Sequence, residues 1–452
     1  MKFDRFDYLV WAVAGALALA IAGVVLAGDH VGARVARTFP AGGEAGAFGP
    51  LGVEFAQAMQ ADTVEARFEL DPPVVGSFRW AGQRLSFAPA RPFRPGVTYT
   101  ARLRAGALAR DGRATLQDRV WQFRVRDPWI VYLASAAGPR EVWRVPAAGG
   151  TPEPLTRTDG RVYDFAVAPD GEQIAYSVVN QGNGADLWLM NRDGGDARLL
   201  VECGLDLCTV PAWSPDGARI AYSREPAGLS PGAPNGPPRV WTVDLASAQT
   251  APLYQNSQIL GYGPVWSPDG RRLAFFDGSE NGIRLLDLQT GREMLIQTLM
   301  GAVGAWSPDS ARMLFTDMNL ETGQPYVTVS LADFEAQTIR PVLGQELNWA
   351  DYSVPAWSPD GEWVAIGLRA ADSGPAKQIW LMRPDGTDGQ AVTADPAYTF
   401  GGYRWDPWGT ALVFQRFEMN KPYATPEVVV WSRATGALTV LVTDGATPEW
   451  LP

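Results

Sequence analysis

The chain has 452 residues, of which 46% are hydrophobic and 19% are charged. This length and composition indicate two or three globular domains and exclude an intrinsically disordered chain. The formal net charge is −11, and a surface of that sign repels phosphate backbones, so nucleic acid is not expected as a partner. His30 is the one histidine, which excludes most histidine-dependent chemistry.

Residues 1–30 contain an uncharged apolar run, Tyr8–Gly28. About 20 apolar residues at about 1.5 Å each span a hydrocarbon core of about 30 Å. This run therefore predicts a single-pass anchor in the cytoplasmic membrane, with the C-terminal bulk of the chain outside the cytoplasm. The alternative is a cleaved signal peptide and a secreted protein, because Val25-Leu26-Ala27 offers small residues for cleavage.

Residues 31–126 read as short alternating strands separated by Pro and Gly turns, which is typical of a β-sandwich. The succession of VEFAQAM, LSFAPARPFRPGVTYTARL, Asp111-Gly112 and WQFRV resembles the bacterial Ig-like domain of surface-layer and other secreted proteins. That resemblance implies a spacer or adhesion module, and it implies no catalytic residue.

Residues 127–452 contain an internal repeat centred on Trp-Ser-Pro-Asp-Gly. Its central prolines, some in degenerate copies, are Pro169, Pro215, Pro268, Pro308, Pro359 and Pro407. A repeat of about 40–50 residues is typical of a β-propeller blade, here built as strand, tight turn and strand. The motif and the apolar strand after it resemble the TolB-like, WD-like repeat, which implies a propeller outside the cytoplasmic membrane. The resemblance does not extend to the function of TolB.

The blade count follows from the strands after each turn, of which seven are expected, the first at 129–133. Only six of them have an inner strand before them. The last residues, Pro448–Pro452, read as the same motif cut off at its proline. They are expected to supply the missing inner strand and to close the ring without an open edge. We therefore predict an all-β chain with a seven-bladed propeller, six or eight blades being the alternatives.

Three further sequence features bear on chemistry. Cys203 and Cys208 predict a short-loop disulfide if the domain lies outside the cytoplasm, and two free thiols otherwise. The motif aspartates are spread around the ring as turn residues, so no metal and no cofactor are expected. Gly228–Gly232 matches the hydrolase string Gly-x-Ser-x-Gly, but no histidine follows it to complete a triad. The sequence thus predicts a protein that is not an enzyme.

The connections that precede the inner strands carry aromatic and acidic side chains on one face of the propeller. Aromatics with polar tips beside carboxylates are typical of recognition surfaces. The alternative is that these aromatics pack between blades. The predicted binding face consists of Tyr163, Asp164, Tyr262, Trp349, Asp351, Tyr352, Tyr398 and Tyr403.

These features predict a membrane-anchored binding or scaffold protein that presents its propeller to a protein, peptide or glycan in the cell envelope. One alternative is a glycan-active enzyme that uses carboxylates alone and would need two of them to converge. Its candidates are Asp164, Asp206, Asp351 and Asp395. The other alternative is a structural component of an envelope assembly.

Overall fold

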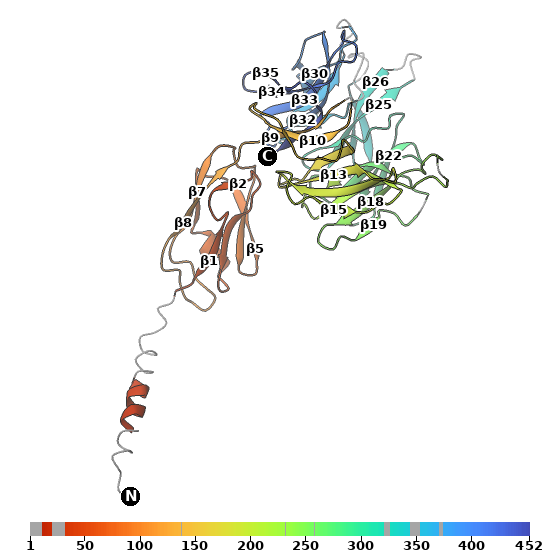
Figure 1. Cartoon of the computed structure of the whole chain (residues 1–452). Coiled ribbons are helices and arrows are strands. Elements are labelled where there is room, and N and C mark those ends of the chain that lie inside the picture. The colour runs from red at the N-terminus through yellow and green to blue at the C-terminus, as the bar shows by residue number, and fades with distance from the viewer. Residues whose placement is uncertain are drawn as a thin grey trace. The chain divides into compact units, whose positions relative to one another are not determined.

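The structure is a computed structural model. It describes residues 11–19, 32–136, 138–230, 232–256, 258–320, 326–343, 353–369 and 374–452. The chain divides into two compact units (Figure 1). The first unit is Met1–Ala45 with Gly49–Val125, and the second unit is Gly46–Phe48 with Arg126–Pro452.

The predicted single-pass membrane anchor is wrong. Within Tyr8–Gly28 the structure describes a helix over residues 11–19, and the rest of that span lies outside the described residues. Of the helices in the described residues, none is both long and apolar enough to span a bilayer.

The first unit is a β-sandwich of two four-stranded sheets. One sheet has the order β1 (Val35–Phe39), β3 (Leu51–Phe55), β6 (Arg84–Pro89) and β5 (Gly76–Ala81). The other has the order β2 (Glu44–Ala45), β8 (Arg119–Val125), β7 (Thr98–Leu103) and β4 (Phe68–Asp71), and a short helix, α2, covers Ala61–Glu65. Aromatic rings join the sheets, because Phe68 of β4 lies 5.5 Å from Phe78 of β5 and 6.0 Å from Phe87 of β6.

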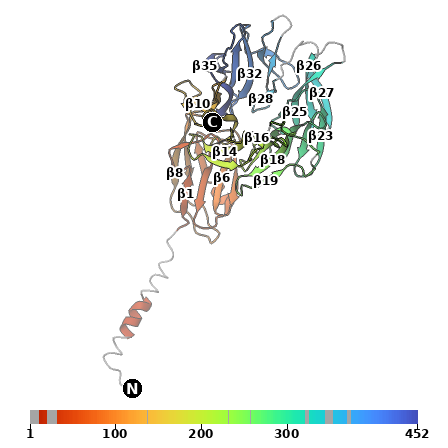
Figure 2. The same cartoon turned by 45° about the vertical axis from the view of Figure 1, so that its right-hand side comes forward.

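The second unit is a β-propeller whose sheets are arranged around a common centre (Figure 2). The first sheet has the order β11 (Glu153–Pro154), β10 (Glu141–Pro146), β9 (Trp129–Ala134) and β36 (Ala446–Leu451). An eight-stranded sheet follows, with β12 (Val162–Val167), β13 (Gln173–Val179), β14 (Ala185–Asn191), β15 (Arg198–Val201), β16 (Leu207–Trp213), β17 (Arg219–Glu225), β18 (Arg239–Asp244) and β19 (Thr250–Pro252). Its two halves are joined by the parallel pairing of Ala185 with Leu207.

Four further sheets of four antiparallel strands complete the second unit. They are β20 (Tyr262–Trp266), β21 (Arg272–Asp277), β22 (Gly282–Asp287), β23 (Glu293–Gln297); β24 (Ala305–Trp306), β25 (Arg312–Asn319), β26 (Tyr326–Asp333), β27 (Thr338–Leu343); β28 (Ala356–Trp357), β29 (Val364–Leu368), β30 (Gln378–Met382), β31 (Gln390–Ala391); and β32 (Tyr398–Trp405), β33 (Ala411–Glu418), β34 (Glu427–Ser432), β35 (Leu438–Val442).

The predicted closure by the last residues is confirmed. Strand β36 pairs antiparallel with β9, with Trp450 opposite Ile130 and Leu451 opposite Trp129. Arg192 fixes the end of the strand, because its Nη1 donates to the carbonyl oxygen of Pro452 at 2.7 Å. The first and last parts of the second unit therefore share one sheet.

The repeat motif forms the turn between the first two strands of a sheet. In the copy at Pro215, the Ser214 hydroxyl donates to Asp216 Oδ1 at 2.6 Å, and the Ala218 N–H donates to the same oxygen at 3.0 Å. Gly217 adopts a φ of +68°, which a side chain would strain. Asp216 is thus engaged within its own turn, and the hydrogen bond from Ser214 is the largest cause that lowers its pKa.

The motif tryptophans link each inner strand to the preceding one. The indole Nε1 of Trp266 donates at 3.1 Å to the carbonyl oxygen of Ala212, the residue just before the tryptophan of the previous repeat. The same bond, at 3.1–3.2 Å, joins Trp213 to Ala166, Trp306 to Val265, Trp357 to Ala305, Trp405 to Ala356 and Trp450 to Arg404. We call this series the tryptophan relay.

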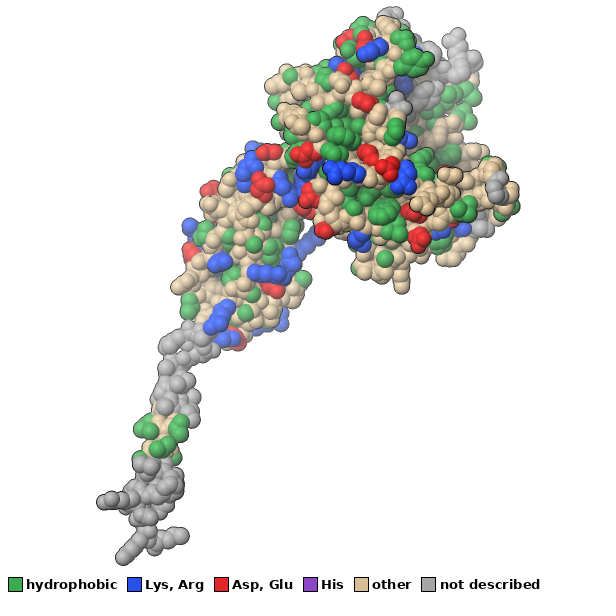
Figure 3. All heavy atoms as spheres, viewed as in Figure 1, with side chains coloured by type: hydrophobic (Ala, Val, Ile, Leu, Met, Phe, Trp, Pro, Cys, Tyr) green, Lys and Arg blue, Asp and Glu red, His purple; other side chains and the backbone are tan. Residues whose placement is uncertain are grey.

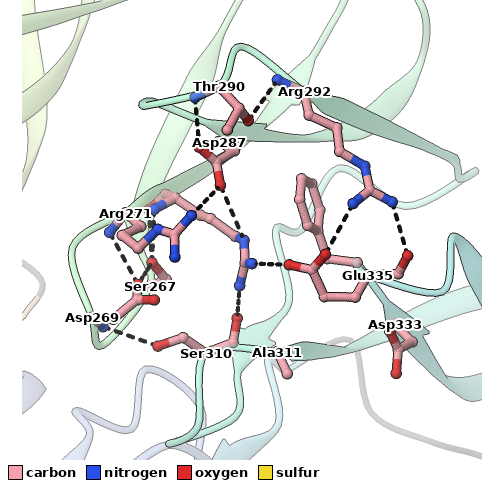
Figure 4. Close-up of polar contacts among 12 residues, drawn as sticks. Ser267, Asp269, Arg271, Asp287, Thr290, Arg292, Ser310, Ala311, Asp333 and Glu335 are labelled. Carbon is pink, nitrogen blue, oxygen red and sulfur yellow. Dashed lines mark hydrogen bonds and ion pairs between the residues drawn. The ribbon is translucent and has the colours of Figure 1, made fainter.

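Ion pairs also join neighbouring sheets, and one of them is the pair of Arg292 with Glu335 (Figure 4). The buried Arg272 takes part in the same cluster. Arg272 of β21 donates to the Ser310 carbonyl oxygen at 2.5 Å and pairs with Glu335, which follows β26. Its guanidinium lies 4.6 Å from the centre of the Phe334 ring, and Arg292 stacks on the same ring at 5.2 Å. Because these charges are paired or stacked, we assign this cluster a structural role.

Replacing a relay tryptophan by phenylalanine removes both ring size and an indole N–H. We expect the loss of the N–H to destabilise the second unit in addition to the loss of ring size. Trp266→Phe should lower the free energy of unfolding by about 1–3 kcal/mol more than Trp431→Phe, because a buried hydrogen bond between sheets is lost. Trp266 and Trp431 are both 8% exposed, which matches the two variants in burial. Urea unfolding followed by fluorescence measures the difference, and equal losses would contradict a stabilising role for the relay.

Candidate binding site at the inner strands

Two copies of the repeat carry a charged residue at a position where the other copies have a small apolar one. The residue before the motif tryptophan is Ala212, Val265, Ala305 or Ala356 in four copies, but Arg404 and Glu449 in the last two. Arg404 lies on β32 and Glu449 on β36, whose inner strands adjoin through the relay bond from Trp450 to the Arg404 carbonyl oxygen. The structure therefore brings a cation and a carboxylate together at neighbouring inner strands.

Asp164 adds a second carboxylate on the next inner strand, β12. Its Oδ2 accepts a hydrogen bond from the backbone N–H of Val210 at 2.5 Å. Val210 has a φ of +53° at a bulge of β16, an unusual conformation for a β-branched residue, which directs this N–H towards Asp164. The other oxygen, Oδ1, is buried, and no residue that the structure describes forms a hydrogen bond of good geometry with it.

Burial is the main cause that raises the pKa of Asp164 to about 6. The nearby Ser177 hydroxyl, the Val210 N–H and the charge of Arg140 act in the opposite direction. A pKa of about 6 leaves Asp164 mostly ionised at pH 7 and mostly protonated at pH 5. The charge of this site therefore changes across a narrow range of mildly acidic pH.

Glu449 is coupled to Asp164 and to Arg404. Its Oε2 accepts the Val167 N–H at 3.2 Å, which ties β36 to β12. Burial raises the pKa of Glu449 and the charge of Asp164 adds to that rise, whereas Arg404 and the Val167 N–H oppose it. Two carboxylates and one arginine on three successive inner strands carry a net charge of −1 when both carboxylates are ionised, which suits a cationic ligand.

Two tyrosines of the predicted face flank this cluster. Tyr163 is 43% exposed and Tyr262 is 39% exposed, so both present ring surface to solvent. Burial, and after it the charges of Tyr163, Asp164 and Glu225, raise the pKa of Tyr262, so Tyr262 lies within electrostatic range of Asp164. We define the inner-strand site as Tyr163, Asp164, Tyr262, Arg404 and Glu449.

The remaining residues of the predicted face lie elsewhere. Tyr403 is 1% exposed and its hydroxyl accepts the Gly367 N–H at 2.9 Å, so it packs between sheets and is not a surface residue. Tyr398 is partly buried under Arg416, whose guanidinium lies 4.0 Å from the ring centre. Trp349, Asp351 and Tyr352 lie outside the described residues.

The other candidate carboxylates are engaged locally. Asp206 pairs with Arg224 at 2.7 Å and accepts the Ala227 N–H at 2.9 Å. Asp395 is exposed and accepts the Ala397 N–H of its own turn at 2.9 Å. Asp206 also lies in the short loop that is closed by the disulfide between Cys203 and Cys208.

Sequence reasoning identified Asp164 but missed Glu449 and Arg404. The available signal was their charge at a motif position that is otherwise small and apolar. Surface charge gives no comparable signal, because Lys and Arg are interspersed with Asp and Glu on the face of the molecule seen in Figure 3, and no large patch of one sign forms there.

Comparison with known proteins supports both units. The family model "Bacterial Ig-like domain" matches residues 29–125, which confirms the predicted Ig-like domain. A solved structure of a puromycin hydrolase is similar with a TM-score of 0.54 and 16% identity, over 71% of this chain and 52% of that chain. This likeness supports the propeller fold. TolB from Acinetobacter baumannii is also similar, with a TM-score of 0.42 and 16% identity over 72% of this chain and 83% of that chain.

Two curated relatives are named as a protease homologue and a peptidase. "Tricorn protease homolog 1" of Streptomyces coelicolor is 28% identical over 221 residues, which is 46% of this chain and 20% of that protein. "Uncharacterized peptidase YuxL" of Bacillus subtilis is 26% identical over 165 residues, which is 30% of this chain and 24% of that protein. The chain thus matches about a fifth to a quarter of these relatives.

These names overturn the prediction that the chain is not an enzyme. That prediction depended on the missing histidine and on an unsuitable context for Gly228–Gly232. Both observations concern one serine-dependent mechanism and cannot exclude enzymes as a class. The relatives place the propeller among proteins named for peptide hydrolysis.

The raised pKa of Asp164 predicts that its charge destabilises the folded state. Because the folded pKa lies above the ordinary value, the penalty is absent below about pH 4 and complete above about pH 6. Asp164→Asn should therefore raise the free energy of unfolding at pH 7.5 by about 1–2 kcal/mol, a value reduced for partial exposure, and have little effect at pH 4. Thermal unfolding at the two pH values measures this, with the exposed Asp395→Asn as control. A gain independent of pH would contradict the assignment.

Proposed function

We propose that this chain is a recognition propeller that binds a cationic group of a peptide or protein at the inner-strand site. The observation that supports this most is the electrostatic interaction of Asp164 and Glu449 on adjoining inner strands, with the Oδ1 of Asp164 buried. An ammonium or guanidinium group would replace the water lost by these carboxylates and would lower their pKa values. Tyr163 and Tyr262 would supply aromatic contacts beside the cation.

The names of the relatives favour a peptide over a glycan as the bound molecule, since they denote a protease homologue and a peptidase. Glycan hydrolysis by carboxylates requires two of them on either side of one bond. Asp206 and Asp395 are held by Arg224 and by a local turn. Recognition of a peptide therefore has the stronger support.

We further propose that the propeller has seven blades. The single pairing of Ala185 with Leu207 joins two four-stranded halves, and counting them separately gives the seventh blade. In this scheme residues 31–126 form an Ig-like spacer that precedes the propeller at 127–452, after the N-terminal segment 1–30. The Ig-like match at 29–125 supports that boundary.

The proposal predicts binding of a short peptide with a free amino terminus or a basic side chain at pH 7. Glu449→Gln and Asp164→Asn should each weaken binding about tenfold or more, because a buried carboxylate that pairs with the cation is lost. Binding to the unaltered protein should weaken between pH 7 and pH 5 as Asp164 becomes protonated. Isothermal titration calorimetry measures all three effects.

The controls separate charge recognition from general affinity. The same peptide with an acetylated amino terminus and no basic residue should bind at least tenfold less tightly. Asp395→Asn removes one negative charge at an exposed turn and should leave the affinity unchanged. Equal binding of the charged and neutral peptides, or equal effects of Asp164→Asn and Asp395→Asn, would refute the proposal.

A further inference from the structure

A cavity opens away from the inner-strand site, between the sheet of β9–β11 and the sheet half of β12–β15. Its volume is about 620 Å³, within the range of pockets that hold small organic ligands. One wall is the segment 154–158 with Arg161, the floor is Tyr176, Val178 and Trp188, and the far wall is the turn at 193–197. We call this cavity the intersheet cleft.

The wall of the cleft is held in place by one carboxylate. Glu141 of β10 accepts the N–H groups of Thr158 and Gly160 at 2.6 and 2.8 Å through Oε1. Its Oε2 accepts the hydroxyl groups of Thr156 and Thr158 at 2.5 and 3.1 Å. A segment fixed by four hydrogen bonds presents its other side chains to the cleft in a constant position.

The floor of the cleft contains hydrogen-bond donors without partners. Tyr176 is 3% exposed, yet its hydroxyl has no hydrogen-bond partner among the described residues and lines the cleft. Trp188 lies beside it, with ring centres 6.5 Å apart, and the Trp188 indole N–H likewise has none within the described part of the chain. The Tyr176 hydroxyl is not enclosed by protein but faces the cleft, where it can donate to a bound group.

The charges of the cleft favour an acceptor-rich, anionic group. Arg157 lines the cleft, and the described residues offer its guanidinium no partner. Arg161 uses its Nε on the Thr158 carbonyl oxygen at 2.7 Å. The opposing charge is Asp193, which accepts the Gly195 N–H at 2.9 Å. Burial and Glu141 raise the pKa of Tyr176 to about 12, so its hydroxyl remains a donor at neutral pH.

We propose that the intersheet cleft binds a small carboxylate-bearing ligand, with the carboxylate at Arg157 and Arg161 and the body of the ligand over Trp188. Tyr176 donates its hydroxyl to an acceptor on the ligand. Arginine recognises carboxylates through its paired N–H groups, and the Trp188 ring offers an apolar face to a sugar ring or to an apolar side chain. Two sources supply this chemistry, a sugar acid and the carboxyl terminus of a peptide.

Paired probes test the proposal by isothermal titration calorimetry on the full chain. One pair is a disaccharide that carries glucuronic acid and its neutral glucose counterpart. The other pair is N-acetyl-Ala-Phe as the acid and as the amide, which carry no amine for the inner-strand site. We expect one acid to bind at least tenfold more tightly than its neutral partner, and the pair that does so identifies the source.

Variants assign the binding to the cleft. Tyr176→Phe removes only the hydroxyl, and Arg157→Gln removes the charge; each should weaken binding about fivefold or more. Asp193→Asn keeps the bond to Gly195 but removes the opposing charge, so it should tighten binding. Tyr222→Phe is the matched control, because Tyr222 occupies the same place in the next repeat and is fully buried away from the cleft.

The outcomes are decisive in either direction. If neither acid binds at millimolar concentration, if acids and neutral probes bind alike, or if Tyr176→Phe behaves as Tyr222→Phe does, the proposal is wrong. Because these probes lack an amine, such a failure leaves the inner-strand site untouched, and a failure of that site leaves the cleft untouched.

Discussion

The tryptophan relay is the constraint on which the second unit depends. Each indole donates to the carbonyl oxygen of the previous repeat, so the inner strands are fixed relative to one another by a bond that repeats with the motif. The Ser-Asp turn aligns the tryptophan, and Gly217 and its equivalents allow the turn. A local sequence pattern thereby determines the packing between sheets that are about 40–50 residues apart in the chain.

The relay is broken at one junction of the described residues, and both candidate sites lie there. Where the pattern requires a tryptophan on β12, the chain has Val167, and its backbone N–H meets the carboxylate of Glu449 in place of an indole bond. This is also the junction that β36 completes from the end of the chain. A position freed from the structural pattern can hold charged groups that would be costly elsewhere in the ring.

The sequence was informative wherever one segment determines its own structure. The repeat predicted the strands, the turns and the pairing of the last residues with the strand that starts at Trp129, and the Ig-like segments predicted the sandwich. The sequence did not predict the contacts that form between segments far apart in the chain. Arg404, Glu449 and Asp164 become neighbours only when the ring closes, and Tyr176 meets its cleft only when the segment held by Glu141 folds against it. Tyr403 reads as a surface aromatic, and only packing reveals its burial.

The two proposed sites have opposite charge, and this difference would fix the direction in which a peptide binds. The inner-strand site is acidic through Asp164 and Glu449, whereas the intersheet cleft is basic through Arg157 and Arg161. A peptide carries an amine at one end and a carboxylate at the other. The carboxylates Asp164 and Glu449 and the lining of the cleft belong to the same two sheets, so opposite signs there match the polarity of such a chain. Rejection of the reversed orientation would follow from the same charges, since each end would then face a group of its own sign.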